Sequence, residues 1–141
     1  MTRLLVVDAS VAVKWFVDEQ DSDAAAALIE DHALAAPELM AVELLNVMTS
    51  RLRAGSTTLD IVTGVVRDLE WMNIQWRPDR ALAAAALTHA VALRHPVYDC
   101  LYLALAIELE CPVVTADRRF ARAAAQGGFG DRVTLLEDLA P

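Results

Sequence analysis

The stretch that decides the fold is residues 4–10, which read LLVVDAS. Residues 4–7 form an unbroken apolar run with β-branched members, and the run ends at Asp8, a pattern typical of a buried strand in a parallel sheet. Other short runs that are strand candidates follow at residues 33–36, 73–76, 113–115 and 133–136. Because segments with helical spacing separate these runs, we predict an α/β fold: a twisted parallel sheet of four to five strands with helices on both faces.

Proline, glycine and hydroxyl residues predict where the helices begin and end. Pro37 is expected at the start of a helix and Gly55 just beyond its end, which predicts a long helix over residues 38–53. Ser56 and Thr57 are expected to cap the next helix, which continues to about residue 71. The other predicted helices cover residues 11–17, 24–32, 81–93, 98–110 and 118–126.

Length and composition limit the class of protein. With 141 residues, of which 56% are hydrophobic, the chain suits a single domain over residues 1–141 with one core. Charges interrupt every apolar run before the roughly 20 residues that a membrane span needs, and Asp8 and Lys14 interrupt the apolar region of any signal peptide. We therefore expect a cytoplasmic protein with no membrane partner. Cys100 and Cys111 lack the spacing of metal ligands and are expected to be reduced core residues.

The charge balance is acidic, with 20 Asp and Glu against 12 Lys and Arg and a formal net charge of -8. Such a chain does not coat nucleic acid nonspecifically as a basic protein does. If nucleic acid is the partner, a local basic patch or bound metal ions must offset the repulsion of the phosphates.

Three aspartates follow the predicted strands or chain breaks, where the active sites of open α/β sheets lie. Asp8 ends the first strand, Asp117 follows the strand at residues 113–115, and Asp99 lies in the first turn of the helix over residues 98–110. Each aspartate also suits a helix N-terminus, where it can cap the helix or complement its dipole. Position alone therefore leaves a structural and a chemical role open for each of them.

Glu43 lies in the middle of an apolar helix and forms a narrow polar stripe with Asn46 and Ser50. A glutamate that is buried there must be paired, protonated or bound to a cation, whereas on a solvated face it needs no partner. If Glu43 and the three aspartates converge, their mutual repulsion favours a hard divalent cation. Ligands that are all oxygen favour Mg²⁺ or Mn²⁺ over zinc.

Four segments resemble, in the family's own order, the motifs of PIN-domain proteins and in particular of the VapC-type ribonuclease toxins. They are residues 8–16 (DASVAVKWF), 36–47 (APELMAVELLNV), 97–106 (VYDCLYLALA) and 113–120 (VVTADRRF). The resemblance implies a PIN-like fold with a catalytic, Mg²⁺-binding pocket in which Mn²⁺ can substitute. The implied catalytic and metal-binding residues are Asp8, Glu43, Asp99 and Asp117, with Ser10, Asn46 and Thr115 orienting ligands or water.

The same resemblance implies an activity and its partners. It implies an endoribonuclease that is the toxin of a type II toxin–antitoxin pair, inhibited by a cognate VapB-like antitoxin and forming a homodimer. Some family members carry a further acid after the fourth motif's aspartate, where this chain has Arg118 and Arg119, so we expect one tightly bound ion. The candidate contacts to RNA phosphates are the basic residues near motif ends, which could equally form ion pairs or a solvated face: Lys14, Arg51, Arg53, Arg94, Arg118, Arg119 and Arg122.

Two alternative functions remain open at this point. One is a catalytically inert PIN-like module that binds RNA or protein. The other is a Mg²⁺-dependent phosphatase, which is disfavoured because its Asp-x-Asp motif is replaced here by Asp8-Ala9-Ser10. His89 and His95 are not expected to form a metal-free acid–base pair, because nothing in the sequence places two histidines at one site.

Overall fold

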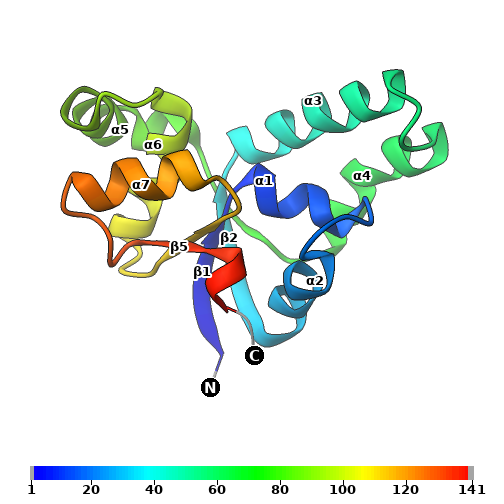
Figure 1. Cartoon of the computed structure of the whole chain (residues 1–141), viewed down its shortest axis with the longest axis horizontal. Helices are drawn as coiled ribbons and strands as arrows, with labels where there is room; N and C mark the ends of the chain where they lie inside the picture. The colour runs from blue at the N-terminus through cyan, green and yellow to red at the C-terminus, as the bar shows by residue number, and fades with distance from the viewer. Residues whose placement is uncertain (1, 140–141) are drawn as a thin grey trace.

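The structure is a computed structural model that describes residues 2–139. Its strands form one parallel sheet in the order β3-β2-β1-β4-β5 (Figure 1). Helices flank the sheet, so the predicted α/β fold class is confirmed. The strands are β1 (Arg3–Val7), β2 (His32–Pro37), β3 (Gln75–Arg77), β4 (Val113–Thr115) and β5 (Val133–Leu135).

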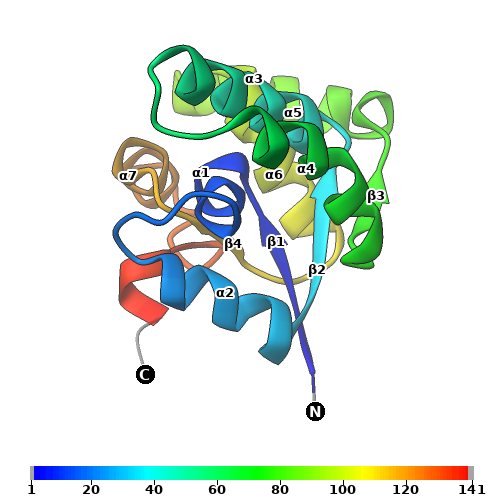
Figure 2. The same ribbon diagram turned by 90° about the vertical axis from the view of Figure 1, so that its right-hand side faces the viewer.

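The helices connect successive strands and cover both faces of the sheet. Helices α1 and α2 lie on one face and α5 and α6 on the other, while α3 and α4 pack against each other near the carboxyl ends of the strands (Figures 1 and 2). The helices are α1 (Ala9–Ala12), α2 (Ser22–Asp31), α3 (Leu39–Arg53), α4 (Leu59–Trp71), α5 (Asp79–Leu93), α6 (Val97–Glu108) and α7 (Arg118–Gln126), with 3-10 turns η1 (Val13–Trp15) and η2 (Leu136–Leu139).

Helix α6 is the central helix of the core. Residues 100–106 of this helix are all buried, and α6 packs against β1 and β2. Each fully buried large apolar side chain stabilises the fold by about 1.5–3 kcal/mol, so this helix is held firmly. Its first turn, which carries Asp99, is thereby fixed at the carboxyl edge of the sheet.

No single helix among residues 2–139 is long and apolar enough to cross a membrane, although α5 and α6 pass that test together as a pair bent by 117°.

The helix predicted over residues 11–17 is the shorter α1 followed by the 3-10 turn η1. Two other predicted boundaries are wrong because hydrogen bonds that the local pattern does not indicate determine where the element ends. Pro37 is the last residue of β2 rather than the start of a helix, because the sheet pairing continues to the backbone N–H of Glu38, which donates to the carbonyl of Arg77 (2.9 Å). The cap of α4 is Thr58, whose hydroxyl accepts from the backbone N–H of Ile61 (3.4 Å). Ser56, which we expected at that cap with Thr57, instead donates to the carbonyl of Arg51.

Candidate active site

A cavity lies where the strand order reverses. Strands β1 and β4 are neighbours, yet the chain continues from β1 toward β2 on one side and from β4 toward β5 on the other. In open α/β sheets such a switch point opens a crevice beyond the carboxyl ends of the strands. Here a cavity of about 270 Å³ is lined by Asp8, Ala9, Ser10, Glu43, Asn46, Val47, Asp99, Tyr102 and Asp117.

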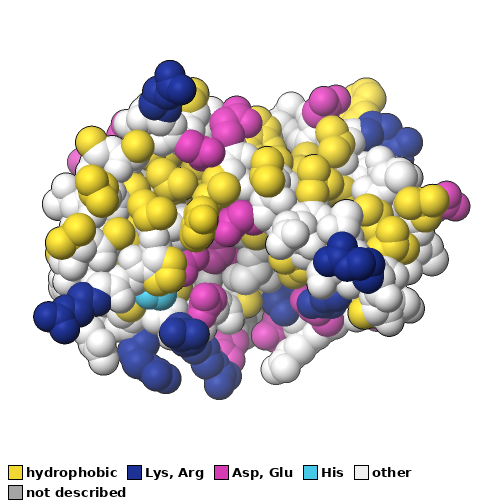
Figure 3. All heavy atoms as spheres, turned by 90° about the horizontal axis from the view of Figure 1, so that it is seen from above, with side chains coloured by type: hydrophobic (Ala, Val, Ile, Leu, Met, Phe, Trp, Pro, Cys, Tyr) yellow, Lys and Arg dark blue, Asp and Glu magenta, His cyan; other side chains and the backbone are white. Residues whose placement is uncertain are grey.

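The cavity brings together the four predicted acids, although they are spread over most of the chain. Asp8 follows β1, Asp117 follows β4, and Asp99 and Glu43 come from α6 and α3. Figure 3 views the carboxyl edge of the sheet from above and shows acidic side chains gathered in the middle of that face, with basic side chains on several sides of them. The sequence analysis made a cation site conditional on these four acids lying close together, and in the structure all four line one cavity.

Asp8 is the most deeply buried of the four acids, with an exposed fraction of 4%. Its carboxylate caps α1 by accepting from the backbone N–H of Val11 (3.2 Å). It also accepts from the hydroxyls of Ser10 (2.6 Å) and Thr115 (2.5 Å). Burial raises the pKa of Asp8 from 3.8 to about 7; the two hydroxyls oppose this rise, and the nearby charge of Asp99 adds to it.

The hydroxyls of Ser10 and Thr115 join the ends of β1 and β4 around Asp8. The Ser10 hydroxyl oxygen accepts from the backbone N–H of Ala116 (2.9 Å), and the Thr115 hydroxyl oxygen accepts from the backbone N–H of Asp117 (3.0 Å). Ser10 lines the cavity, whereas Thr115 is fully buried behind it. Both side chains therefore orient the Asp8 carboxylate while also fixing the turn that carries Asp117.

Glu43 is partly buried and points at the cavity from the first half of α3. Its carboxylate accepts a hydrogen bond from the hydroxyl of Tyr102 (2.5 Å), a residue of α6 with an exposed fraction of 1%. Burial raises the pKa of Glu43, Tyr102 opposes the rise, and the charge of Asp99 adds to it. Asn46 also lines the cavity, while Ser50 is exposed, so the polar stripe of α3 faces the cavity at one end and solvent at the other.

Asp99 and Asp117 occupy the first turn of α6 and the N-cap of α7. One carboxylate oxygen of Asp117 accepts from the backbone N–H groups of Arg119 (2.9 Å) and Phe120 (3.4 Å). Oδ2 of Asp99 lies 2.6 Å from Nε2 of His95. Burial raises the pKa of Asp99, the hydrogen bond and charge of His95 lower it, and the charge of Asp117 raises it further. The helix-cap role and the cavity position thus coexist in Asp117, as they do in Asp8.

Sequence reasoning missed two residues that hold these acids, Tyr102 and His95. Tyr102 follows Asp99 by three residues and His95 precedes it by four, spacings that place side chains on one face of a helix. The spacing of Tyr102 and Asp99 within one predicted helix could have indicated Tyr102. The spacing of His95 and Asp99 gave no such indication, because Pro96 separates His95 from that helix. The other histidines lie elsewhere: the ring of His89 packs edge-on against Phe129 (5.1 Å between centroids) and His32 lines a separate cavity beside α2.

The donor set around the cavity fits a hard divalent cation. No group of three His, Cys, Asp or Glu side chains within residues 2–139 is arranged to hold a metal ion by itself. Mg²⁺ commonly binds through one or two carboxylates and fills its remaining positions with water and phosphate oxygens. The available donors are carboxylate, hydroxyl and amide oxygens, and burial raises the pKa of Asp8, Glu43 and Asp99. A cation would offset the negative charge that this burial concentrates.

Three of the seven basic residues predicted to contact RNA form ion pairs. Lys14 and Arg51 both pair with Glu19 (3.4 and 3.0 Å), and Arg118 pairs with Glu137 (2.8 Å). Lys14 and Arg118 line a second polar cavity of about 290 Å³, which shares Ala116 with the turn after β4.

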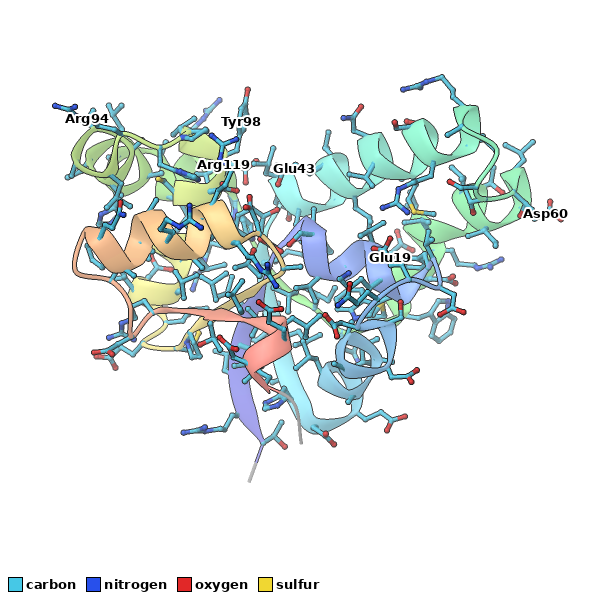
Figure 4. All side chains as sticks on the ribbon, viewed as in Figure 1. Glu19, Glu43, Asp60, Arg94, Tyr98 and Arg119 are labelled. Atoms are coloured by element: carbon cyan, nitrogen blue, oxygen red, sulfur yellow. The ribbon has the colours of Figure 1, made fainter. Side chains whose placement is uncertain are left out.

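The other four candidates, Arg53, Arg94, Arg119 and Arg122, are exposed and form no ion pair within the part of the chain that the structure describes. Arg119 and Tyr98 lie on the α6–α7 side of the cavity, across from Glu43 (Figure 4). Arg94 lies farther out, at the end of α5. Arg119 is therefore the better placed of these two to meet a ligand at the cavity.

Comparison with known proteins agrees with this architecture. The family model described as "PIN domain" matches residues 5–126. The fold is similar to that of PAE2754 from Pyrobaculum aerophilum, with a TM-score of 0.68 and 23% sequence identity over 99% of this chain and 95% of that chain. A PilT N-terminus domain protein, SSO1118 from Sulfolobus solfataricus P2, gives a TM-score of 0.45 and 12% identity over 96% and 89%. No curated protein sequence matches the chain.

Proposed function

We infer the function from one premise: the chain belongs to the PIN-domain family, whose model matches most of its length. PIN domains are generally nucleases, and those nucleases bind RNA. We propose that this chain, as a single domain over residues 1–141, is a Mg²⁺-dependent endoribonuclease. The observation that carries the proposal is the single cavity lined by Asp8, Glu43, Asp99 and Asp117 at the switch point of the sheet.

The chain's own residues hold the acids ready for a cation. Hydroxyls of Ser10 and Thr115 orient Asp8, the phenol of Tyr102 orients Glu43, and backbone N–H groups of α7 orient Asp117. We propose that the four acids hold Mg²⁺, or Mn²⁺ in its place, and that Asn46 helps to orient water. In such a site a divalent cation activates water for attack on a phosphodiester and stabilises the leaving oxygen. The expected products carry 5′-phosphate and 3′-hydroxyl ends.

RNA must approach an acidic protein, so local positive charge matters. Arg119 and Arg122 are exposed on α7, the helix that begins directly after Asp117. Phosphate contacts position a nucleic acid through charge and hydrogen bonds that are independent of sequence. We propose these two arginines as the main phosphate contacts. Lys14, Arg51 and Arg118 can contribute only by exchanging their present acidic partners for phosphate.

The biological role rests on the four motifs that resemble VapC-type toxins. We propose that the chain is the toxin of a type II toxin–antitoxin pair in the cytoplasm, that a VapB-like antitoxin covers the acidic cavity, and that two copies form a homodimer. Exposed apolar side chains on α5 and α6, among them Leu87, Val91 and Tyr98, offer a surface for such contacts. Family membership favours this nuclease role over the phosphatase alternative.

The test is RNA cleavage by the purified chain with Mg²⁺ and with a chelator. We expect cleavage only with the metal, and we expect Asp99→Asn to abolish it while Asp60→Asn, an exposed acid on α4 (Figure 4), leaves it unchanged. Products with cyclic 2′,3′-phosphate ends would indicate a metal-free reaction instead. Expression in cells should arrest growth, and a folded wild-type protein that neither cuts RNA nor slows growth would favour the inert module.

A further inference from the structure

His95 lies in the short connection between α5 and α6 and contacts Asp99, one of the acids that line the cavity. Its Nε2 lies 2.6 Å from Oδ2 of Asp99, and only 11% of its side chain is exposed. Its ring stacks on Phe120 of α7, with centroids 5.6 Å apart and an interplanar angle of 22°. The imidazole is therefore held between Asp99 in the first turn of α6 and Phe120 in α7, although it does not line the cavity itself.

The backbone around His95 is shaped to place this ring. Arg94 ends α5 with a left-handed φ of 52°, a conformation that is unfavourable for a residue other than glycine. The N–H of His95 then donates to the carbonyl of Ala90 (3.2 Å), which closes the end of α5. Pro96 follows and fixes the entry into α6. A strained turn between two fixed points leaves the side chain of His95 little freedom.

Each of the four acids accepts a hydrogen bond from the protein, and His95 is the partner of Asp99. Asp8 is held by hydroxyls, Glu43 by a phenol and Asp117 by backbone N–H groups. Asp99 has the imidazole of His95 on Oδ2, and the structure gives its Oδ1 no hydrogen-bond donor among residues 2–139. Each of the four carboxylates that line the cavity is thus held by at least one hydrogen bond from the protein.

We propose that His95 is a positioning residue: its Nε2–H donates to Oδ2 of Asp99 and fixes that carboxylate so that Oδ1 can bind the divalent cation. The inference rests on the proposed function, because it assumes that Asp99 is a cation ligand. Partners that orient the ligands of a metal typically change metal affinity or activity by about 10–100-fold when they are removed. His95 acts through Asp99 and is not among the residues that line the cavity.

Two substitutions separate the hydrogen bond from the packing. His95→Phe keeps an aromatic ring to stack on Phe120 but removes the donor, whereas His95→Gln loses the ring and offers an amide N–H near the position of Nε2. His89→Phe is the matched control, because that ring packs on Phe129 outside the cavity. A residue that serves only packing would tolerate Phe better than Gln, and the proposal predicts the reverse order for metal binding.

The experiment is calorimetric titration of the full chain with Mn²⁺, followed by RNA cleavage as a function of Mn²⁺ concentration. We expect His95→Phe to weaken Mn²⁺ binding by about 10–100-fold with an intact fold, and we expect His95→Gln and His89→Phe to stay within about threefold of wild type. Wild-type affinity in His95→Phe, or equal losses in His95→Phe and His95→Gln, would overturn the inference while leaving the nuclease proposal intact.

If His95→Phe does not fold, His95→Asn replaces it, because the shorter amide does not reach Oδ2 of Asp99. The contrast between His95→Gln and His95→Asn then decides the question: retained Mn²⁺ affinity only in His95→Gln supports the inference, and equal affinities overturn it. A wild-type chain that binds no Mn²⁺ and cuts no RNA would overturn the proposed function and this inference together. The two failures are thus distinguished by the behaviour of the wild type.

Discussion

Asp8→Asn is expected to stabilise the metal-free protein above neutral pH even though it should abolish cleavage. The Asp8 carboxyl is 4% exposed, and burial raises its pKa from 3.8 to about 7. Because the folded protein binds this proton more tightly than the unfolded chain, the folded state loses stability as the pH rises from about 4 to about 7. Above that range the full cost of the buried negative charge is present, and asparagine removes it.

The magnitude follows from the pKa and from the hydrogen bonds. At about 1.4 kcal/mol per pKa unit, the rise from 3.8 to about 7 corresponds to roughly 4 kcal/mol. Asparagine keeps an oxygen for Ser10 and for the N–H of Val11, but its amide group faces Thr115, whose hydroxyl must turn toward Ser10 (3.3 Å away). That rearrangement costs about 1 kcal/mol. The net stabilisation is therefore roughly 3 kcal/mol above pH 7, and it becomes a loss of about 1 kcal/mol near pH 4.

Urea unfolding in a chelating buffer from pH 4 to pH 8.5 measures this difference. Glu43 and Asp99 titrate in both proteins, so subtracting the two stability curves isolates the contribution of Asp8. Asp60→Asn, at an exposed position of α4, should stay within about 0.5 kcal/mol of wild type at every pH. A difference between Asp8→Asn and wild type that does not change with pH, or a variant that is less stable at pH 8, would refute the reasoning.

Three further predictions concern the metal, a partner of Glu43 and the RNA. Mg²⁺ at 100 times its Kd should stabilise the wild type by about 3 kcal/mol and raise its Tm in a melting assay, and an equal rise in Asp8→Asn would argue against binding at this site. Tyr102→Phe, which keeps the buried ring and removes the donor to Glu43, should slow cleavage by about 10–100-fold, whereas an unchanged kcat would deny Tyr102 a part in holding that acid. Arg119→Ala should raise KM for RNA and lower the salt dependence of binding by about one phosphate contact. Arg67→Ala, an exposed arginine on α4, should do neither. Equal effects of the two substitutions would mean that RNA binding depends on the net charge of the protein and not on a contact made by Arg119.

The sequence predicted the fold well because burial leaves a local imprint. The central strands β1 and β4 are largely buried, so residues 4–7 form a continuous apolar run and residues 113–114 a shorter one, and the intervening helices show their own spacing. The errors at Pro37 and Thr58 arise where a distant backbone group or the next residue offers a better hydrogen bond than the local pattern indicates. Local patterns therefore predict which elements exist more securely than they predict where each one ends.

In the candidate site, too, local patterns identified some residues and missed others. The acids themselves were identifiable, because a carboxylate after a strand or within an apolar helix is conspicuous. The family resemblance also implied supporting roles for Ser10 and Thr115, whereas the bond of Tyr102 to Glu43, which joins residues 59 positions apart, was not predicted. The pairing of Arg51 with Glu19 was not predicted either, because these two residues lie far apart in the sequence.

The energetics of Asp8 bear on whether this copy of the domain is inert. A module that only bound a partner would gain stability by replacing Asp8 with a neutral residue, because the buried charge costs roughly 4 kcal/mol above pH 7 in the absence of a cation. Stabilities of whole domains are only about 5–15 kcal/mol, so this cost is a large fraction of the total. The surrounding hydroxyls of Ser10 and Thr115 hold the carboxylate in place and only partly compensate its burial. A costly acid held in this way, next to three others in one cavity, is the arrangement expected of a site that binds a cation and performs chemistry.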